Sequence, residues 1–424
     1  MAHATVLQPE RPAHAGPILA GMMFALSVTG YFDRTIISIA GPRILTDFHL
    51  TETQLGTIYS AFLCSYALLM IPGGYLADRI GPRTALTVMA IGTGVFTALT
   101  AAGGQPWLSL LIGVVPGFIL LRLAAGVFAS PLYPACARMN ANWFTAENRS
   151  RVQGIVSSGA GLGGALSPVI FSRMMARYGW QTSFVAAGIF TVLLGIVWHL
   201  SARDYPHPQH LFQRREPVRW RALLLNRQIV LLTLGFMCLD YFEYIFFYWS
   251  YYYFGQVRKL GSEQSVVYTT IMMLTWLVMT PFGGWLSDRL VKRWGVRKGL
   301  RSVAVGGFAA SALLLFAGAH STGTAAAVTF ISLALGFASC ADVTFWAAAI
   351  NVAGRQSGTA SGIMNSGGNV GGFIAPILTP WIAGRAGWAA GLYFGSAVAL
   401  LGMLTWFSID PTKKLQAPEN VGLG

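Results

Sequence analysis

Charged residues are scarce in this chain of 424 residues. Only 10% of its residues are charged, 54% are hydrophobic, and the mean hydropathy is +0.56. A soluble globular domain carries about 25% charged residues, so this composition excludes that class. Apolar runs of about 20 residues recur along the chain, bounded by charges or turn residues, which predicts a polytopic membrane protein.

Cysteine and histidine are also few. The four cysteines lie in or at the ends of apolar runs, form no CxxC pair, and are Cys64, Cys136, Cys238 and Cys340. The seven histidines are scattered along the chain. These spacings exclude a disulfide framework and a metal motif, so we expect no metal and no cofactor.

Acidic residues number 15 against 29 Lys and Arg, which gives a net charge of +14. With the N-terminus in the cytoplasm, 21 of the 29 basic residues fall in cytoplasmic segments. The positive-inside rule therefore accounts for the basicity, and we predict a lipid bilayer rather than a nucleic acid as partner. We expect a plasma (bacterial inner) membrane protein with both termini cytoplasmic. The stretch before Pro17 lacks a signal-peptide pattern, so no removable targeting segment is expected.

Twelve apolar runs are long enough to cross a bilayer. They lie near 17–41, 53–77, 84–103, 107–137, 152–176, 180–200, 228–254, 265–287, 301–320, 325–352, 358–384 and 388–409. The predicted fold class is an all-α polytopic membrane protein with twelve transmembrane helices in two six-helix, pseudo-symmetric halves.

The halves share sequence. Gly-Gly-Tyr-Leu-Ala-Asp-Arg at 73–79 returns as Gly-Gly-Trp-Leu-Ser-Asp-Arg at 283–289, and glycine and proline positions of the fifth and eleventh spans repeat at an offset of 208. We therefore predict an N-terminal half at 1–201, a basic cytoplasmic linker at 202–227 and a C-terminal half at 228–424. Parallel repeats of this kind form transporters with a midplane cavity. The clustered glycines fit either moving or static helix contacts.

Six charged residues lie well inside the predicted spans, away from their ends. Inserting a charged side chain at the centre of a bilayer costs about 2.5–3.5 kcal/mol. Each such residue is therefore expected to have a partner, to face a water-filled cavity or to have a functional role. The six are Asp33, Arg34, Arg122, Asp240, Glu243 and Asp342. For the first three, a structural ion pair is the alternative to a transport role, and for the last three the two interpretations stand equal.

Helical geometry sorts these residues by face. Neighbouring residues point about 100° apart, so Asp33 and Arg34 face different partners. Tyr31, Arg34 and Ser38 share one face, as do Asp240, Glu243 and Tyr244 on the seventh span. A carboxyl group in a low-dielectric cavity can take up or release a proton near neutrality, which is the physical basis of proton coupling.

The seventh span is rich in aromatic residues from Tyr241 to Tyr253. Most of them are expected to face lipid or form an interfacial belt. Tyr244 and Tyr248, one turn apart, can instead face the cavity, and the ligand would then be aromatic or larger than a simple sugar acid.

The segment Gly74-Tyr75-Leu76-Ala77-Asp78-Arg79-Ile80-Gly81-Pro82-Arg83 resembles the signature loop of the major facilitator superfamily. Pro82 departs from the usual basic residue. The resemblance implies that the charged pairs of the two copies latch the halves and act in gating. These pairs are Asp78 with Arg79 and Asp288 with Arg289.

Within that superfamily the chain is similar to the anion:cation symporters, on motifs spread over nearly its whole length. They include Tyr-x-Asp-Arg at 31–34, Arg122 with Gly126, Pro134 and Ala135, Phe-Trp at 345–346 and Gly-Ile-Met-Asn-Ser-Gly-Gly-Asn at 362–369. The resemblance implies Asp33 as a proton carrier and Arg122 as a contact to the substrate carboxylate. It also implies a set of cavity residues: Tyr31, Arg34, Tyr66, Trp346, Asn365 and Asn369.

One position departs from the family pattern. Many proton-coupled members carry a Glu two turns after the fourth-helix Arg, where this chain has Ala129. We expect Glu243, with Asp240, to supply the second proton-coupling site.

The sequence thus predicts a functional monomer that moves a small organic anion, such as a sugar acid or an aromatic acid, by proton symport with alternating access. A proton-driven exporter of drugs or metabolites is the alternative. A membrane enzyme would need a nucleophile with a base or a metal cluster, and no such spacing appears, so we expect no enzymatic activity. A receptor is disfavoured by the duplication.

Overall fold

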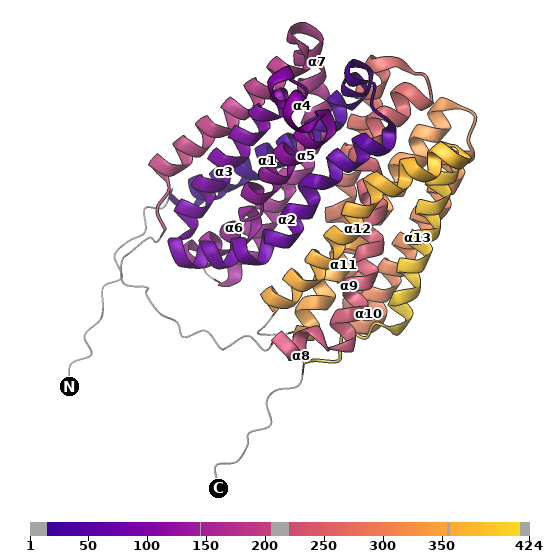
Figure 1. Ribbon diagram of the computed structural model, residues 1–424. Helices are drawn as coiled ribbons and strands as arrows, with labels where there is room; N and C mark the ends of the chain where they lie inside the picture. Colours follow the sequence, from indigo (N-terminus) through magenta and orange to yellow (C-terminus); the bar gives the residue numbers. More distant parts are fainter. Residues whose placement is uncertain (1–14, 145, 205–219, 354–356, 416–424) are drawn as a thin grey trace, which may run out of the picture.

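The computed structural model describes residues 15–144, 146–204, 220–353 and 357–415, and Figure 1 shows it as a ribbon. Its α-helices are α1 (Ala15–Phe48), α2 (Glu52–Ile80), α3 (Pro82–Leu99), α4 (Pro106–Ile112), α5 (Val114–Ala129), α6 (Leu132–Trp143), α7 (Ala146–Ser201), α8 (Trp220–Leu224), α9 (Arg227–Tyr252), α10 (Gly261–His320), α11 (Thr324–Ala353), α12 (Ser357–Ala386) and α13 (Trp388–Ser408). A 3-10 turn (Thr100–Ala102) follows α3 and a π-helical turn (Tyr253–Val257) follows α9.

Eight helical segments of the described residues are long and apolar enough to cross a membrane. Two of them, in α7 and α10, are pairs of spans joined at a kink, at Gly179 and Gly295. Helices α1 and α12 have the length but not the hydropathy, because they carry the polar residues of the predicted site. The all-α architecture predicted from the sequence is confirmed.

The predicted fourth span, 107–137, is wrong in its boundaries. Its first turns form the separate helix α4, because Gly113 has a φ of 88° and interrupts the helix there. A second break follows Ala129, and α6 begins after Pro131, which lacks the N–H needed to continue a helix. The span therefore consists of α5 and α6.

The backbone repeats the duplication seen in the sequence. Gly81 and Gly295, with φ of 85° and 79°, precede the third and ninth spans. Gly179 and Gly387, with φ of 79° and 86°, precede the sixth and twelfth spans and lie 208 positions apart. A side chain strains this left-handed conformation, so both repeats need glycine at the same two turns.

Each repeat also ties its third helix to the end of its last one. The backbone N–H of Arg83 donates to Asp204 Oδ1 at 2.7 Å, just past α7. In the second repeat, Arg297 Nη1 lies 3.4 Å from Asp410 Oδ2, just past α13. The hydroxyl of Thr412 donates to Asp410 and holds the pKa of that carboxyl below its usual range.

Helices α1 to α7 and α9 to α13 form two groups in Figure 1, with α2 beside α12 where the groups meet. The hydroxyl of Ser60 donates to the carbonyl of Phe373 at 2.6 Å. One turn earlier, Gly56 is so close that a Cβ there would lie 1.9 Å from the carbonyl oxygen of Pro376. These contacts lie in the first half of α2, far from the repeated Gly-Gly-x-Leu-x-Asp-Arg segment at its other end.

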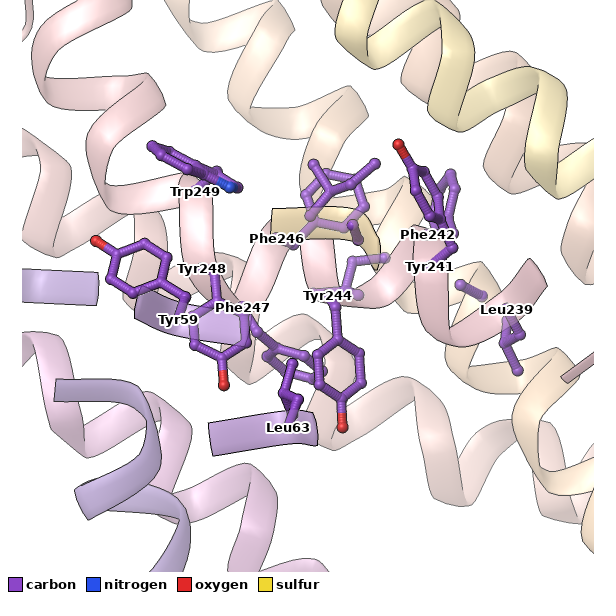
Figure 2. Packing of buried hydrophobic residues seen from close by; sticks show 14 of the residues in the cluster. Tyr59, Leu63, Leu239, Tyr241, Phe242, Tyr244, Phe246, Phe247, Tyr248 and Trp249 are labelled. Carbon is purple, nitrogen blue, oxygen red and sulfur yellow. The ribbon is translucent and has the colours of Figure 1, made fainter. Parts of the chain in front are cut away.

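The aromatic residues of α9 face protein, which corrects the expectation that most of them face lipid. Each is at most 8% exposed, and the set is Tyr241, Phe242, Tyr244, Phe246, Phe247, Tyr248, Trp249, Tyr251 and Tyr253. Figure 2 shows how closely these rings pack, with the ring of Tyr59 from α2 beside that of Tyr248. The helix is buried all round from 238 to 251, where α12, α13, α11 and α1 pack against it, whereas Val230 and Leu234 nearer its start are exposed.

Candidate substrate-binding site

Arg34 of α1 lies in a cage of aromatic rings. Its guanidinium carbon is 4.9 Å from the ring centre of Tyr244, 5.2 Å from those of Tyr31 and Tyr66, and 5.6 Å from that of Phe62. Its Nη2 also donates a hydrogen bond to the hydroxyl of Tyr244. Three of these residues come from α1 and α2 and one comes from α9, so the cage joins the two groups of helices.

Asp33 points in another direction, as the 100° rotation per residue requires. Its Oδ2 accepts a hydrogen bond from the hydroxyl of Thr191, in the sixth span, at 2.8 Å. The side chain is buried, and its Oδ1 has no hydrogen-bond partner among the described residues. Thr191 thus anchors one oxygen, and the hydroxyl of Thr97, itself without a partner among the described residues, also lies near this carboxyl group.

Arg122 of α5 is completely buried beside Asp33 and Arg34. Its Nη2 donates to the backbone carbonyl of Arg34 at 3.2 Å, and its guanidinium carbon lies 4.8 Å from the centre of the Phe62 ring. Its Nε and Nη1 have no partner in the part of the chain that the structure describes. A buried donor left unpaired costs about 1–3 kcal/mol, and more if it is charged.

The alternative of a structural ion pair fails in this conformation. Within the described ranges, no carboxylate oxygen lies within 4.0 Å of a guanidinium nitrogen of Arg34 or Arg122. The salt bridges Arg43–Asp47 and Arg297–Asp410 lie elsewhere. The charges at the site are therefore neighbours without being paired.

Three acids of the second half approach the cage from the other side. Asp342 of α11 interacts electrostatically with both Asp240 and Glu243 of α9, and Asp240 also interacts with Arg34. The indole N–H of Trp346 donates to Asp342 Oδ1 at 3.3 Å. Glu243 Oε1 has no hydrogen-bond partner among the described residues. The three carboxyl groups form a cluster that one cation cannot neutralise.

The two asparagines of α12 continue this side of the site. Asn369 Oδ1 accepts a hydrogen bond from the Tyr244 hydroxyl at 3.5 Å, and its Nδ2 donates to the carbonyl of Asn365 at 2.8 Å. The Nδ2 of Asn365 lies 3.2 Å from Met70 Sδ of α2. Both asparagines therefore lie where the two groups of helices meet.

The predicted gating residues lie away from this site. Arg79 and Asp288 are exposed, and Arg289 packs over the ring of Trp285 in its own helix, 5.5 Å from the ring centre. The side chain of Asp78 lies outside the described residues. The gating role of these four residues remains a prediction.

A cavity of about 980 Å³ lies elsewhere. It is bordered by the last turns of α1, the kink of α7 and the first turn of α10. Its lining includes Arg43, Asp47, Trp180 and Glu263, and none of the predicted substrate residues. Asp47 already accepts from the Trp180 indole at 2.9 Å and pairs with Arg43 at 3.4 Å. We therefore place the substrate chemistry at the buried arginines rather than in this cavity.

Sequence reasoning missed three residues that organise the site and its frame. Phe62 contacts both buried arginines and lies one turn before Tyr66, so helical spacing could have included it. Asp204 could have been found because both halves end in an Asp followed within two residues by proline, at 204–206 and 410–411. No sequence signal marks Thr191 as the partner of Asp33.

A known protein family matches most of this chain. The family model described as Major Facilitator Superfamily matches residues 23–376 and, in a second match, residues 289–422. The chain belongs to the Major Facilitator Superfamily. It is thus a member of a family of membrane transporters, and the second match overlaps the repeated half.

Relatives within the Major Facilitator Superfamily cover nearly the whole chain. A probable sulfoacetate transporter, SauU, of Cupriavidus necator is 29% identical over 422 residues, which are 95% of each chain. A hexuronate transporter of Bacillus subtilis is 29% identical over 387 residues, 88% of this chain and 89% of the relative. Among solved structures, an inward-facing, unoccupied bacterial homologue of the human lysosomal transporter Spinster matches with a TM-score of 0.77. It is 15% identical and covers 97% of this chain and all of its own, which supports the fold.

Proposed function

We propose that this protein carries a small organic acid anion across the membrane by proton symport with alternating access. The observation that carries the proposal is Arg122, a completely buried cation with two unpaired nitrogens that neighbours Asp33, whose Oδ1 is also unpaired. A carboxylate or sulfonate would supply the missing acceptors. The relatives named for sulfoacetate and hexuronate transport point to the same chemical class.

Proton coupling follows from how the charges balance. Arg122 binds the acid group of the substrate, and Asp33 carries a proton while the loaded site is closed to both sides. Neutralising Asp33 in that state removes a charge that would otherwise have to cross the low-dielectric interior. The proton and the substrate then move together, because the transporter changes its open side most readily when the site is both loaded and protonated.

The moving bodies in this proposal are the halves 1–201 and 228–424, joined by the linker 202–227. Most of the linker, 205–219, lies outside the described residues. With both termini cytoplasmic, the contacts of Gly56 and Ser60 with α12 are external, so the described conformation is closed outside. Its gating segments lie on the cytoplasmic side. The working unit is a monomer in the plasma (bacterial inner) membrane.

Counterflow in proteoliposomes tests the function directly. Vesicles loaded with unlabelled sulfoacetate or galacturonate should accumulate the labelled acid transiently, and a protonophore should not abolish this exchange. Neither an enzyme nor a receptor would catalyse it. Absence of exchange across a panel of sulfonated, sugar and aromatic acids would refute the proposal.

Replacing Gly56 with Ala should push the two halves apart at the external end. A Cβ at Gly56 meets the backbone of Pro376 at 1.9 Å, and a backbone carbonyl on a packed helix cannot swing away. Spin labels at exposed Thr46 and Gln264, at the external ends of α1 and α10, should report a longer mean distance. Gly21→Ala is the control, because a Cβ there meets nothing within 4 Å. An unchanged distance distribution would contradict this account of the closed end.

Replacing Glu243 with Gln should remove one pH-dependent step from transport. The side chain is buried, with Oε1 unpaired, and lies near Asp342, so a proton is the simplest means of neutralising it. The ratio of protons to substrate, measured from paired fluxes in proteoliposomes, should fall by one. Glu263→Gln, at an exposed position in the first turn of α10, should leave it unchanged. Proton-driven uptake with an unaltered pH dependence would refute Glu243 as a coupling site.

A further inference from the structure

Tyr248 of α9 carries a buried hydroxyl without a partner. The side chain is 1% exposed, and its ring stacks on that of Tyr59 with the ring centres 5.2 Å apart and the planes at 24°. The hydroxyl forms no hydrogen bond with any described residue. Figure 2 shows it pointing to the same side as the hydroxyl of Tyr244, which Arg34 already engages.

Tyr248 lies near both buried arginines, because it interacts electrostatically with Arg122 and with Arg34. The Tyr59 hydroxyl is unpaired too, but it is packed against Gly41, where a Cβ would lie 2.0 Å from it. Tyr59 therefore fixes the ring of Tyr248 and leaves the Tyr248 hydroxyl as the free donor.

Three unpaired donor groups thus gather in one buried place: Nε and Nη1 of Arg122 and the hydroxyl of Tyr248. Burial without partners is costly for each of them, so a fold that keeps all three together gains most when an acceptor-rich group enters. The oxygens of a carboxylate or a sulfonate only accept hydrogen bonds, so either group can satisfy several donors at once.

We propose that Tyr248 is a substrate-binding residue whose hydroxyl, with Arg122, forms an oxoanion subsite for the carboxylate or sulfonate of the transported acid. This inference rests on the proposed function and adds a residue to its site. Arg34 and its aromatic cage then remain to contact the rest of the substrate. The subsite orients the acid group, because a hydroxyl held by a ring stack donates from a fixed direction.

Tyr248→Phe tests the inference while keeping the ring stack with Tyr59. Initial rates of sulfoacetate and galacturonate uptake should show a KM raised about tenfold, the effect of one lost hydrogen bond to a charged group, with kcat within about twofold of wild type. Tyr241→Phe is the matched control on the same helix. Its hydroxyl is bonded to Thr379 at 3.1 Å, and its loss should leave KM unchanged.

The outcomes separate the two proposals. Wild-type counterflow together with an unchanged KM in Tyr248→Phe would overturn the subsite and leave the proposed function standing. Equal effects of Tyr248→Phe and Tyr241→Phe would also overturn it, because they would show general damage to α9. A KM raised for sulfoacetate alone would assign the subsite to a sulfonate, and one raised for galacturonate alone would assign it to a carboxylate. Absence of wild-type exchange would refute the function and the subsite together.

Discussion

Replacing Arg122 with Gln should reduce uptake of the organic acid by at least about 100-fold. The substitution removes a cation that no carboxylate contacts within the described residues and whose Nε and Nη1 are unpaired. Two charge-assisted hydrogen bonds to a substrate anion are worth about 1.5–3 kcal/mol each, which converts to that loss or more. The measurement is the initial rate of labelled acid uptake by proteoliposomes with an imposed proton gradient.

The same variant should fold at least as well as the wild type. Removing a buried charge that has no carboxylate partner among the described residues relieves a desolvation cost, so thermal unfolding in detergent should shift upward or not at all. Arg173→Gln is the matched control, because it removes an exposed guanidinium whose hydrogen bond goes to a carbonyl of its own helix. If Arg122→Gln kept near-normal uptake, Arg122 would not be the anion ligand. If it unfolded the protein, the arginine would be structural.

Replacing Asp33 with Asn should abolish proton-driven accumulation and leave exchange intact. The amide oxygen of Asn can still accept the hydrogen bond from Thr191, so the packing between α1 and the sixth span is kept. An amide cannot take up and release a proton, so the site stays in its neutral form. Counterflow should therefore continue, and uphill uptake driven by a pH gradient should fall to background.

The pH dependence of exchange is a second measurement on the Asp33→Asn variant. Exchange by the wild type should vary with pH as Asp33 gains and loses its proton, and exchange by Asp33→Asn should lose that part of the dependence. Asp47→Asn is the control, because Asp47 is bonded to Trp180 and paired with Arg43 far from the site. Concentrative uptake by Asp33→Asn would show that another group carries the proton.

The helices were largely predictable because the lipid bilayer imposes a simple rule. A span needs about 20 apolar residues, and most runs of that length in the sequence became helices with the expected limits. The fourth span failed where local backbone geometry competes with hydropathy. Gly113 and Pro131 sit inside or beside an apolar run, and counting apolar residues does not register a positive φ or a missing N–H.

The site was predictable as a list of residues and less so as an arrangement. Arg34, Tyr31 and Tyr244 could be named because polar groups in a membrane helix stand out against their neighbours, and Tyr66 was named only through the family resemblance. Their assembly into one cage depends on how α1, α2 and α9 rotate against each other. The aromatic face of α9 was misjudged for the same reason, since a ring looks alike in sequence whether lipid or another helix covers it.

The hydrogen bond from Arg34 to Tyr244 suggests how an inhibitor would differ from a substrate, namely by leaving this bond unbroken. It belongs both to the candidate site and to the contact between the halves. In the proposed cycle, an acid that draws Arg34 away from Tyr244 would weaken a tie between the halves and so favour the next step. An acid that binds Arg122 and leaves this bond intact would hold the protein in the described conformation. Compounds too short to reach Arg34 should therefore occupy the site without being carried.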